Sequence, residues 1–457
     1  MSDKHSESSS TDAPEPGVDQ GKLLKAVGIW FGISAAIGNT IAAGIVRTPG
    51  DIAQWLPNQF LFLLVWVIGG LYALAGASSL AELACAIPRS GGQYNYSRRA
   101  LGEYAGFVVG WSDWLSNCGT LAAVAIVVGE YVEELIPAAM GLVQVIAIST
   151  IIFFGVLQSK GVDWGSKVQV ITAVLKTFAF LILVIACFVV GPLGGTPIVH
   201  ATKELHLASG WPFIVALMLS LQAVFYTIDG WHGIIYMAEE VKDPAKEIPR
   251  TIFISVFSVV AIYLSLNAAV LFVVPIDEVA GNKFALGLAA EHVFGQWGGP
   301  IIRVIMIVSL LSCINAVQMF ASRILYGLSH DGLFFHATAK VNKGGTPIPA
   351  LILSTLIAIL FVSLGSFEKV MAILAFFFVA NYMLSYVSIF VLRRTEPDME
   401  RPYKAWGYPW TSGAALVISA VFLIAALIAN PETALFALGI LVVSLPVYKY
   451  FKHSSKS

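Results

Sequence analysis

Residues 223–240 read AVFYTIDGWHGIIYMAEE and continue an apolar run, WPFIVALMLSLQ, at 211–222. Together the two segments are long enough for a membrane-spanning helix. About where the middle of a bilayer would lie, however, the run carries Tyr226, Thr227, Asp229 and Gly230. An ionised Asp is costly at that depth, and Gly weakens a helix. The stretch therefore predicts a membrane helix that is interrupted halfway across.

The composition supports a membrane protein. Of the 457 residues, 57% are hydrophobic and 12% are charged, whereas soluble proteins carry about 25% charged residues. Uncharged runs such as 138–157 and 251–274 are each long enough to cross roughly 30 Å of hydrocarbon as helices. The short segments of alternating polarity that form a membrane β-barrel are not the pattern here. We predict an all-α, multi-pass membrane protein with the lipid bilayer as its main partner.

Other classes are disfavoured. The four cysteines lie in or beside apolar segments and have neither metal-site nor disulfide spacing, and we find no nucleophile–base or nucleotide motif. We therefore expect no metal, no cofactor and no enzymatic activity. A net charge of −1 gives no reason to expect a nucleic-acid partner. The polar stretch 1–21 lacks the apolar core of a signal peptide and is expected to be a disordered tail.

Hydropathy predicts twelve spans, and the charges test that count. With the N-terminus in the cytoplasm, 21 of the 27 Lys and Arg residues fall on the inner side, 5 fall outside and Lys176 alone lies within a span. This is the expected positive-inside bias, so we place both termini on the cytoplasmic side of the cell membrane. The outer loop at 277–299 is long enough to hold a short helix. The predicted spans are 25–55, 60–86, 104–130, 138–158, 167–191, 211–240, 251–275, 300–328, 348–366, 370–393, 411–430 and 433–450.

The first span is interrupted as well. Its middle, GISAAIGNTIAAGIVRTPG at 32–50, contains Gly38, Asn39, Thr40 and Gly44. The two interrupted spans, the first and the sixth, are five apart, so the two halves of the protein would face opposite ways. Paired interruptions at matching positions are typical of transporters built from inverted repeats. The alternative is that these glycines only allow close helix packing.

Two facing breaks would suit a zwitterion. Irregular backbone inside a membrane is tolerated where it is buried in protein or lines a polar cavity. The second half of a broken helix offers unpaired N–H groups to an anion, and the first half offers free carbonyls to a cation. An α-amino acid carries both charges, and it is the ligand that this arrangement predicts.

Four motifs of the sequence resemble those of the amino acid–polyamine–organocation superfamily of permeases, in particular bacterial relatives of the L-type amino acid transporters. The most specific match is GGLYALAGASSLAELACAIPRSGGQYNYSRRALGEYAGFVVGW at 69–111. Three further motifs follow in the family's order: DGW with AEEVKDPAKEIPR at 238–250, SRILYGLSHDGLF at 322–334, and RPYKAWGYPW at 401–410.

The resemblance implies a fold and an activity. The fold is a five-plus-five inverted repeat of the leucine-transporter type, with a core at 22–394 and two more helices within 395–457. The activity is alternating-access transport of amino acids, expected to be neutral ones, by an exchanger or a proton-coupled importer. A monomer and a homodimer both remain open.

It also implies binding residues. In relatives, the backbone N–H groups of a Gly-rich triplet in the first span bind the substrate carboxylate; here the triplet is Ala42, Ala43 and Gly44, with Ala in place of the first Gly. Tyr226 matches the aromatic residue that closes the pocket from outside, and Gly230 permits the break. The ammonium group is expected at the carbonyls of Thr40, Tyr226, Thr227 and Asp229.

Lys176 lies well inside the fifth span. A central Lys costs roughly 2.5–3.5 kcal/mol on insertion scales. Its side chain either snorkels toward the inner surface or lies inside the bundle as a fixed cation. The resemblance favours the interior, where a Lys contacts the broken first span in the region that holds sodium in sodium-coupled relatives, and it therefore argues against sodium coupling there.

Several other polar residues have two interpretations. Asn117, Cys313 and Asn315 lie on helices that line the pocket in relatives, but interhelical hydrogen bonds would explain them equally well. Glu82 and Arg89 form either an inner gate or an interfacial ion pair. For His232 we predict no proton-carrying role, because a single histidine is more often structural.

Two other functions compete with amino acid transport. A polyamine or amine permease of the same superfamily would need acidic groups in its pocket, and Asp229 is the candidate. A transport-inactive sensor would need a signalling module, and the sequence contains no clear one.

Overall fold

The computed structural model describes residues 23–25, 27–193, 206–364, 367–429 and 431–454, and in these ranges it is helical without a β-strand. The predicted tail at 1–21 lies outside the described residues. The α-helices are α1 (Ile29–Thr40), α2 (Gly44–Trp55), α3 (Gln59–Ala86), α4 (Gln93–Leu101), α5 (Glu103–Leu135), α6 (Val143–Ser159), α7 (Val162–Leu193), α8 (Trp211–Ile228), α9 (Pro244–Val273), α10 (Ile276–Val279), α11 (Ala285–Phe294), α12 (Gly298–His330), α13 (Ile348–Leu364), α14 (Phe367–Thr395), α15 (Trp410–Ala429) and α16 (Pro431–Ser454).

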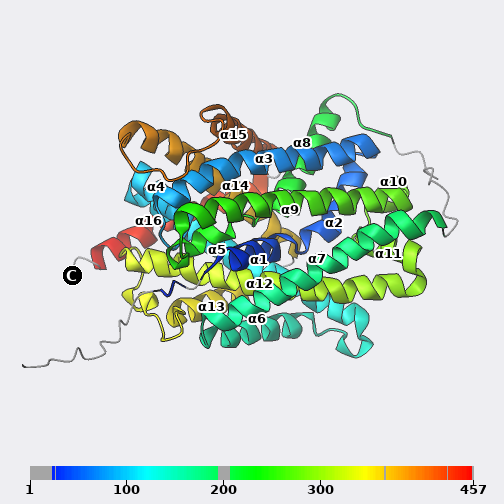
Figure 1. Cartoon of the computed structure of the whole chain (residues 1–457), viewed down its shortest axis with the longest axis horizontal. Coiled ribbons are helices and arrows are strands. Elements are labelled where there is room, and N and C mark those ends of the chain that lie inside the picture. Colours follow the sequence, from blue (N-terminus) through cyan, green and yellow to red (C-terminus); the bar gives the residue numbers. More distant parts are fainter. Residues whose placement is uncertain (1–22, 26, 194–205, 365–366, 430, 455–457) are drawn as a thin grey trace, which may run out of the picture.

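The long helices run side by side along the longest axis of the molecule (Figure 1). The end of α16 and the short helix α4 lie at one end of the bundle, and α10 and α11 lie at the other. Eight helices in the described part of the chain are long and apolar enough to cross a membrane, or nine if the bent pair α1–α2 is one span. Each predicted span contains a helix, but α6 and α13 are shorter apolar helices, and the count of twelve spans stays a prediction.

Apolar side chains occur both inside the bundle and on its outer surface, which explains the high hydrophobic content of the chain. The helix α5 lies inside the bundle, where it packs against α4, α6, α12, α13 and α14. In contrast, α7 turns apolar side chains outward, among them Ile171, Phe178 and Ile185. Soluble proteins rarely expose such contiguous apolar patches, whereas lipid tails are as apolar as these side chains. The protein is therefore a multi-pass membrane protein.

Both predicted interruptions are present. The helices α1 and α2 meet at a 44° bend, with residues 41–43, the first break, between them. The helix α8 ends at Ile228, and the 3₁₀ helix η2 (Gly233–Glu240) begins after residues 229–232, the second break. Since α1 contacts η2 and α2 contacts α8, the two broken helices run antiparallel with their breaks side by side.

Some elements differ from the prediction. The second half of the sixth span is a 3₁₀ helix, and Met237 inside it has non-helical angles. The helix α4 was not predicted; its sequence QYNYSRRAL is too polar to produce a hydropathy signal. The loop at 277–299, predicted to lie outside, holds α11 and most of α10, so the expectation of a short helix in this loop is confirmed.

Candidate functional site

A small cavity lies at the two breaks. Its volume is about 30 Å³, which leaves room for one or two water molecules. Most of the residues predicted from the sequence line it, while Ala43, Gly230, Lys176 and Asn315 do not. The predicted residues in the lining are Thr40, Ala42, Gly44, Asn117, Tyr226, Thr227, Asp229 and Cys313.

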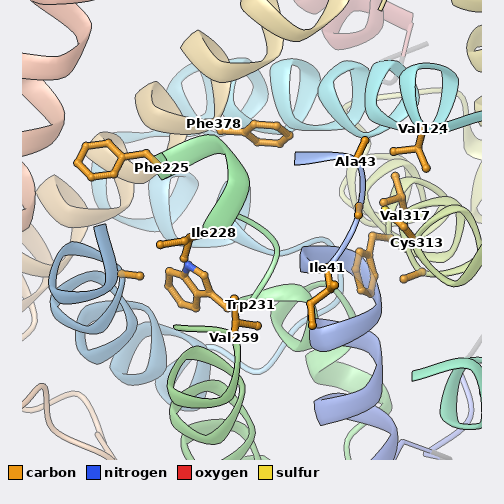
Figure 2. Packing of buried hydrophobic residues seen from close by; sticks show 14 of the residues in the cluster. Ile41, Ala43, Val124, Phe225, Ile228, Trp231, Val259, Cys313, Val317 and Phe378 are labelled. Atoms are coloured by element: carbon orange, nitrogen blue, oxygen red, sulfur yellow. The ribbon is translucent and has the colours of Figure 1, made fainter. Parts of the chain in front are cut away.

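The rest of the lining comprises four polar residues, Asn39, Thr120, His232 and Tyr236, and three apolar ones. Val124 of α5, Val317 of α12 and Phe378 of α14 line the cavity, and Figure 2 shows Val124 and Val317 near Ala43 of the first break. None of these was predicted, because an apolar residue on an apolar helix does not stand out from its neighbours.

Lys176 reaches the first break from α7. Its Nζ donates hydrogen bonds to the carbonyl oxygens of Gly38 and Ile41, each at 3.0 Å, and its side chain is fully buried. The structure thus excludes snorkelling: the cation lies inside the bundle against the end of α1. There it satisfies carbonyls that lose their helical partners where α1 stops.

The other carbonyls at the end of α1 are also occupied. Each carbonyl from 38 to 41 accepts a hydrogen bond from a side chain of another helix. The Thr40 carbonyl, which was expected to bind the substrate ammonium, therefore has one of its two lone pairs in use. The donors, from α9 and α12, are Cys313 Sγ to Asn39 at 3.3 Å, Tyr263 Oη to Thr40 at 2.7 Å, and Ser309 Oγ to Ile41 at 2.6 Å.

The helix α2 begins at the cavity. Its N-cap is Ala43, and no side chain caps its amides. Gly44 allows close approach to α8, since a Cβ there would come 2.8 Å from Thr227 Oγ1. The same oxygen shares a 2.7 Å hydrogen bond with Thr48 Oγ1. First-turn amides carry partial positive charge, so α2 offers an anion-binding end to the cavity lined by Ala42 and Gly44.

Gly230 permits the second break. Its φ of +111° suits glycine and strains other residues. A Cβ there would come 2.6 Å from Asn39 Nδ2, and this nitrogen donates to the Gly230 carbonyl at 3.4 Å. The two breaks therefore contact each other directly through Asn39 and Gly230.

The carboxylate of Asp229 contacts α14. It accepts a hydrogen bond from Tyr382 Oη, which also lies 2.6 Å from Nδ1 of His232. Asp229 lines the cavity, but one of its oxygens is occupied by Tyr382. The sequence did not indicate Tyr382 as a partner, since 153 residues separate the two.

Asn315 does not line the cavity. Its amide donates to the Gly165 carbonyl at 2.9 Å and to Gln169 Oε1 at 2.8 Å, so it forms interhelical hydrogen bonds between α12 and α7. Of the two interpretations of Asn315, the structure therefore has the interhelical hydrogen bonds. Asn117 does line the cavity, and its amide donates to the backbone and side chain of Asp113.

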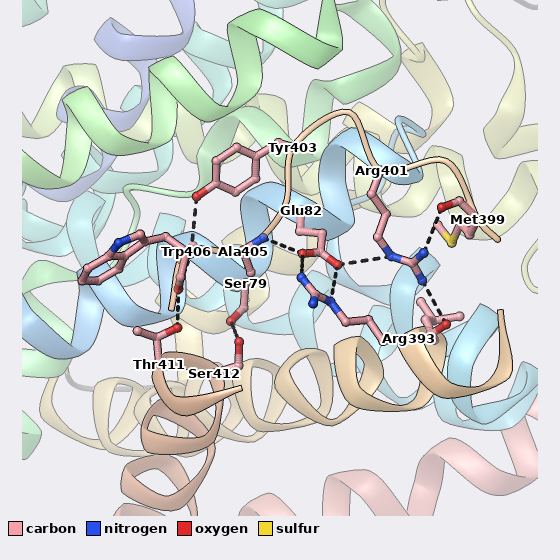
Figure 3. A network of polar contacts seen from close by, with 12 residues as sticks. Ser79, Glu82, Arg393, Met399, Arg401, Tyr403, Ala405, Trp406, Thr411 and Ser412 are labelled. Carbon is pink, nitrogen blue, oxygen red and sulfur yellow. Dashed lines mark hydrogen bonds and ion pairs between the residues drawn. The ribbon is translucent and has the colours of Figure 1, made fainter. Parts of the chain in front are cut away.

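Glu82 and Arg89 do not pair with each other. Figure 3 shows Glu82 between Arg393 of α14 and Arg401. The carboxylate oxygens of Glu82 lie 2.5 Å from the Arg393 guanidinium and 3.3 Å from that of Arg401. The backbone amide of Ala405 also donates a hydrogen bond to Glu82. Arg89 instead pairs with Asp331 at 2.8 Å. The predicted ion pair between Glu82 and Arg89 is therefore wrong, and a part for either residue in an inner gate stays a prediction.

These contacts join the four sequence motifs at one end of the bundle. Glu82 of the first motif meets Arg401 of the last. Glu240 and Arg323 of the two middle motifs form a fully buried ion pair at 2.9 Å. Breaking a buried pair by removing one partner is strongly destabilising, so these motifs hold this end of the bundle together.

An apolar helical bundle whose two broken helices meet at a cavity is typical of membrane transport proteins. Comparison with known proteins gives the family: the profile of the amino acid permease family matches residues 23–443. The chain belongs to the amino acid permease family.

Its relatives are transporters and exchangers. The chain is 27% identical over 442 residues to the serine/threonine exchanger SteT of Bacillus subtilis (strain 168), covering 95% of this chain and 98% of that protein. It is 28% identical to the large neutral amino acids transporter small subunit 2 of Homo sapiens, covering 99% and 86%. It is 26% identical to the Asc-type amino acid transporter 1 of Mus musculus, covering 93% and 81%.

Proposed function

We propose that this protein moves neutral amino acids across the cell membrane by alternating access, with the substrate held between the two breaks. The observation that carries the proposal is the meeting of two helix ends of opposite partial charge at one cavity, the uncapped start of α2 and the end of α8. The substrate carboxylate binds the amides of Ala42, Ala43 and Gly44. The ammonium binds carbonyls among those of Thr40, Tyr226, Thr227 and Asp229.

The occupied carbonyls refine this assignment. Thr40 already accepts from Tyr263, and the Tyr226 carbonyl accepts from the Asp229 amide at 3.2 Å. Each keeps one lone pair. The carbonyls of Thr227 and Asp229 therefore make the larger contribution to binding the ammonium group.

The lining favours an uncharged side chain on the substrate. Of the residues described there, Asp229 is the sole carboxylate, and Tyr382 occupies one of its oxygens. Val124, Val317 and Phe378 form an apolar wall, against which a second charge would be poorly solvated. The methyl of Ala42, where relatives carry Gly, narrows the site further and favours small substrates.

The small cavity supports alternating access. About 30 Å³ suffices for a water or two but not for an amino acid. The breaks must move apart to admit substrate, and the residues at 41–43 and 229–232 are the points where the two helices can bend. We assign Tyr226 to closing the outer side.

Lys176 serves as a fixed cation in this cycle. Its Nζ fills the space beside the Gly38 and Ile41 carbonyls, where a sodium ion would otherwise find oxygen ligands. This supports transport without sodium at that position, by exchange or by proton coupling. A transport core at 22–394 with inverted repeats, twelve spans and cytoplasmic termini completes the proposal.

Counterflow in proteoliposomes tests the function. Purified protein is reconstituted with unlabelled substrate inside, and uptake of labelled neutral, acidic and basic amino acids and of polyamines is measured. We expect small neutral amino acids to be taken up. Uptake of polyamines alone would favour the amine permease, and failure of every compound to enter would overturn the transport proposal.

A matched pair of glycine variants assigns the activity to the site. Gly44→Val places a side chain against Thr227, since even a Cβ at this position would come 2.8 Å from Thr227 Oγ1. This variant should abolish counterflow. Gly439→Val in α16, where nothing lies within 4 Å of the added carbon, should retain it. Equal activity of both variants would argue against substrate binding at the start of α2.

A further inference from the structure

A row of buried, hydrogen-bonded side chains runs along the cavity, where Asp229, His232 and Tyr236 are part of the lining. Tyr382 Oη donates to Asp229 and lies 2.6 Å from His232 Nδ1. On the other side of the imidazole, His232 Nε2 lies 2.9 Å from Tyr236 Oη, and Tyr236 Oη lies 3.0 Å from Oδ1 of Asp113. We call these five residues the buried array. The array begins with a carboxyl group at the second break and ends with another in α5.

Counting hydrogens shows what the buried array holds. Its four contacts, from Asp229 through Tyr382, His232 and Tyr236 to Asp113, need one hydrogen each. Each phenol supplies one, and a neutral imidazole supplies one. With both carboxyl groups ionised, this makes three. The fourth must come from a protonated Asp113, a protonated Asp229 or a doubly protonated His232.

The far end of the array has a vacant acceptor. Oδ2 of Asp113 is buried, and it has no hydrogen-bond partner among the described residues. A buried carboxylate oxygen without a partner is costly when the group is ionised. The fourth hydrogen is thus stabilised at this end when Asp229 is ionised. Binding of an ammonium group beside Asp229 favours that same distribution.

We propose that the buried array is a proton-binding site that couples amino acid transport to the pH gradient, one proton for each substrate. The inference rests on the proposed function and resolves its choice between exchange and proton coupling. It also assigns to His232 the role that the sequence alone did not support.

The proton moves by a concerted shift along the array. The O–H bond of Asp113 breaks as its proton passes to Tyr236 Oη, and the phenol proton of Tyr236 passes to His232 Nε2. The Nδ1 proton of His232 passes to Tyr382, and the phenol proton of Tyr382 passes to Asp229. One proton is displaced from one end to the other, and each inner group keeps its proton count.

Other titratable groups surround the array but do not interrupt it. From α3, Tyr72 faces Asp229 and binds Ser419 at 2.8 Å. Beyond the array, Glu240 of η2 and Arg323 of α12 neutralise each other. The remaining groups, from α14, α8, α12 and α7, are Tyr386, Tyr226, Cys313 and Lys176.

The array extends from the cavity toward one end of the bundle. Asp113 lies ten residues from the start of α5, roughly 15 Å along the helix. The backbone of Tyr236 accepts a hydrogen bond from the Gly91 amide at 3.1 Å, in the loop at the α4 end of the bundle. Asp113 is therefore nearer to that end, while Asp229 lies at the cavity.

Proteoliposomes with and without an imposed pH gradient test the inference. We expect wild-type protein to accumulate substrate when the outside is acidic, and to take up about one proton per substrate, read with a pH-sensitive dye. In Tyr236→Phe, the ring that packs on Phe320 remains but the link is broken. Gradient-driven accumulation should then fall about tenfold or more, and it should fall further than counterflow does, because exchange of one substrate for another needs no net proton movement.

Two further variants make the test specific. Asp113→Asn should behave as Tyr236→Phe does, since an amide cannot carry the transferable proton. The matched control Tyr72→Phe removes a buried phenol near Asp229 that is outside the array, and it should keep gradient-driven accumulation. Should Asp113→Asn fail to fold, Tyr236→Phe still decides the result.

The outcomes separate the two proposals. Counterflow in wild-type protein without any response to the pH gradient would overturn proton coupling and leave amino acid exchange in place. Unchanged gradient-driven accumulation in Tyr236→Phe would likewise overturn the role of the array. Absence of counterflow in the wild type would overturn the transport function itself.

Discussion

The two breaks satisfy their freed backbone groups in different ways. At the first break, carbonyls 38 to 41 accept hydrogen bonds from side chains of three other helices, including the cation Lys176. At the second break, the hydroxyl of Tyr382 contacts both the carboxylate of Asp229 and the imidazole of His232. The first break is thus held by donors of fixed direction, whereas the second is held by groups that can exchange protons. We therefore expect the first break to position the substrate and the second break to respond to its binding.

Removing the cation of the first break should have the largest effect. In Lys176→Met, the Gly38 carbonyl loses its donor and Ile41 keeps Ser309 alone. Loss of hydrogen bonds to a charged group, at about 1.5–3 kcal/mol, should slow transport roughly a hundredfold. Lys167→Met on the exposed face of the same helix is the control. Wild-type counterflow in a folded Lys176→Met protein would refute the positioning role.

The second break depends on one backbone conformation. Gly230→Ala adds a methyl at φ +111° and 2.6 Å from Asn39, a strain of about 1–3 kcal/mol. We expect a lower melting temperature in detergent and roughly tenfold slower transport. Gly210→Ala provides the match, since its φ is +64° but nothing lies within 4 Å of the added carbon. Equal losses in both variants would mean that contact between the breaks is unimportant.

A smaller effect should come from the contact between α2 and α8. Thr48→Val removes the 2.7 Å hydrogen bond to Thr227 without changing the shape of the side chain, at a cost of about 1 kcal/mol. A double-mutant cycle with Thr227→Val measures how strongly the two hydroxyls are coupled in the free energy of unfolding. If the effects of the two substitutions simply add, the hydroxyl pair does not couple α2 to α8.

The smallest effect on the pH response should come from Asp331, which lies outside both breaks. Burial alone would raise the pKa of its carboxyl, but Arg89 and Arg98 outweigh burial and hold that pKa below its ordinary 3.8. The stabilisation by ionised Asp331 is therefore fully present above about pH 4 and is lost as the pH falls through the lower folded value.

Asp331→Asn should accordingly lower stability by a constant amount between about pH 5 and pH 8. It should leave the pH profile of transport in that range unchanged. A profile shifted as far as that of Tyr236→Phe would place the pH response at the end of the bundle and not at the second break.

The sequence predicted the breaks better than their partners. Gly38, Asn39, Asp229 and Gly230 stand out inside apolar runs because each is unfavourable in a membrane helix. Lys176 was detected for the same reason. These signals are local, so they could be recognised without knowledge of the packing.

The partners carry no such signal. Tyr263 and Tyr382 are ordinary residues on apolar helices, and their functions follow from contacts with residues 223 and 153 positions away. The wrong prediction of a Glu82–Arg89 ion pair has the same origin. The partners of Glu82 in the structure are Arg393 and Arg401, and both are remote from it in sequence. Only the folded bundle shows which hydroxyl reaches which carbonyl.

The long separation between Glu82 and Ala405 has a consequence for biosynthesis. The two residues are 323 positions apart, so at about 5–20 residues per second the ribosome produces Ala405 roughly 15 to 65 s after Glu82. During that interval, α3 carries a carboxylate whose arginine and amide partners do not yet exist. The environment of Glu82 is therefore completed only when the segment preceding α15 has been made, late in synthesis of the chain.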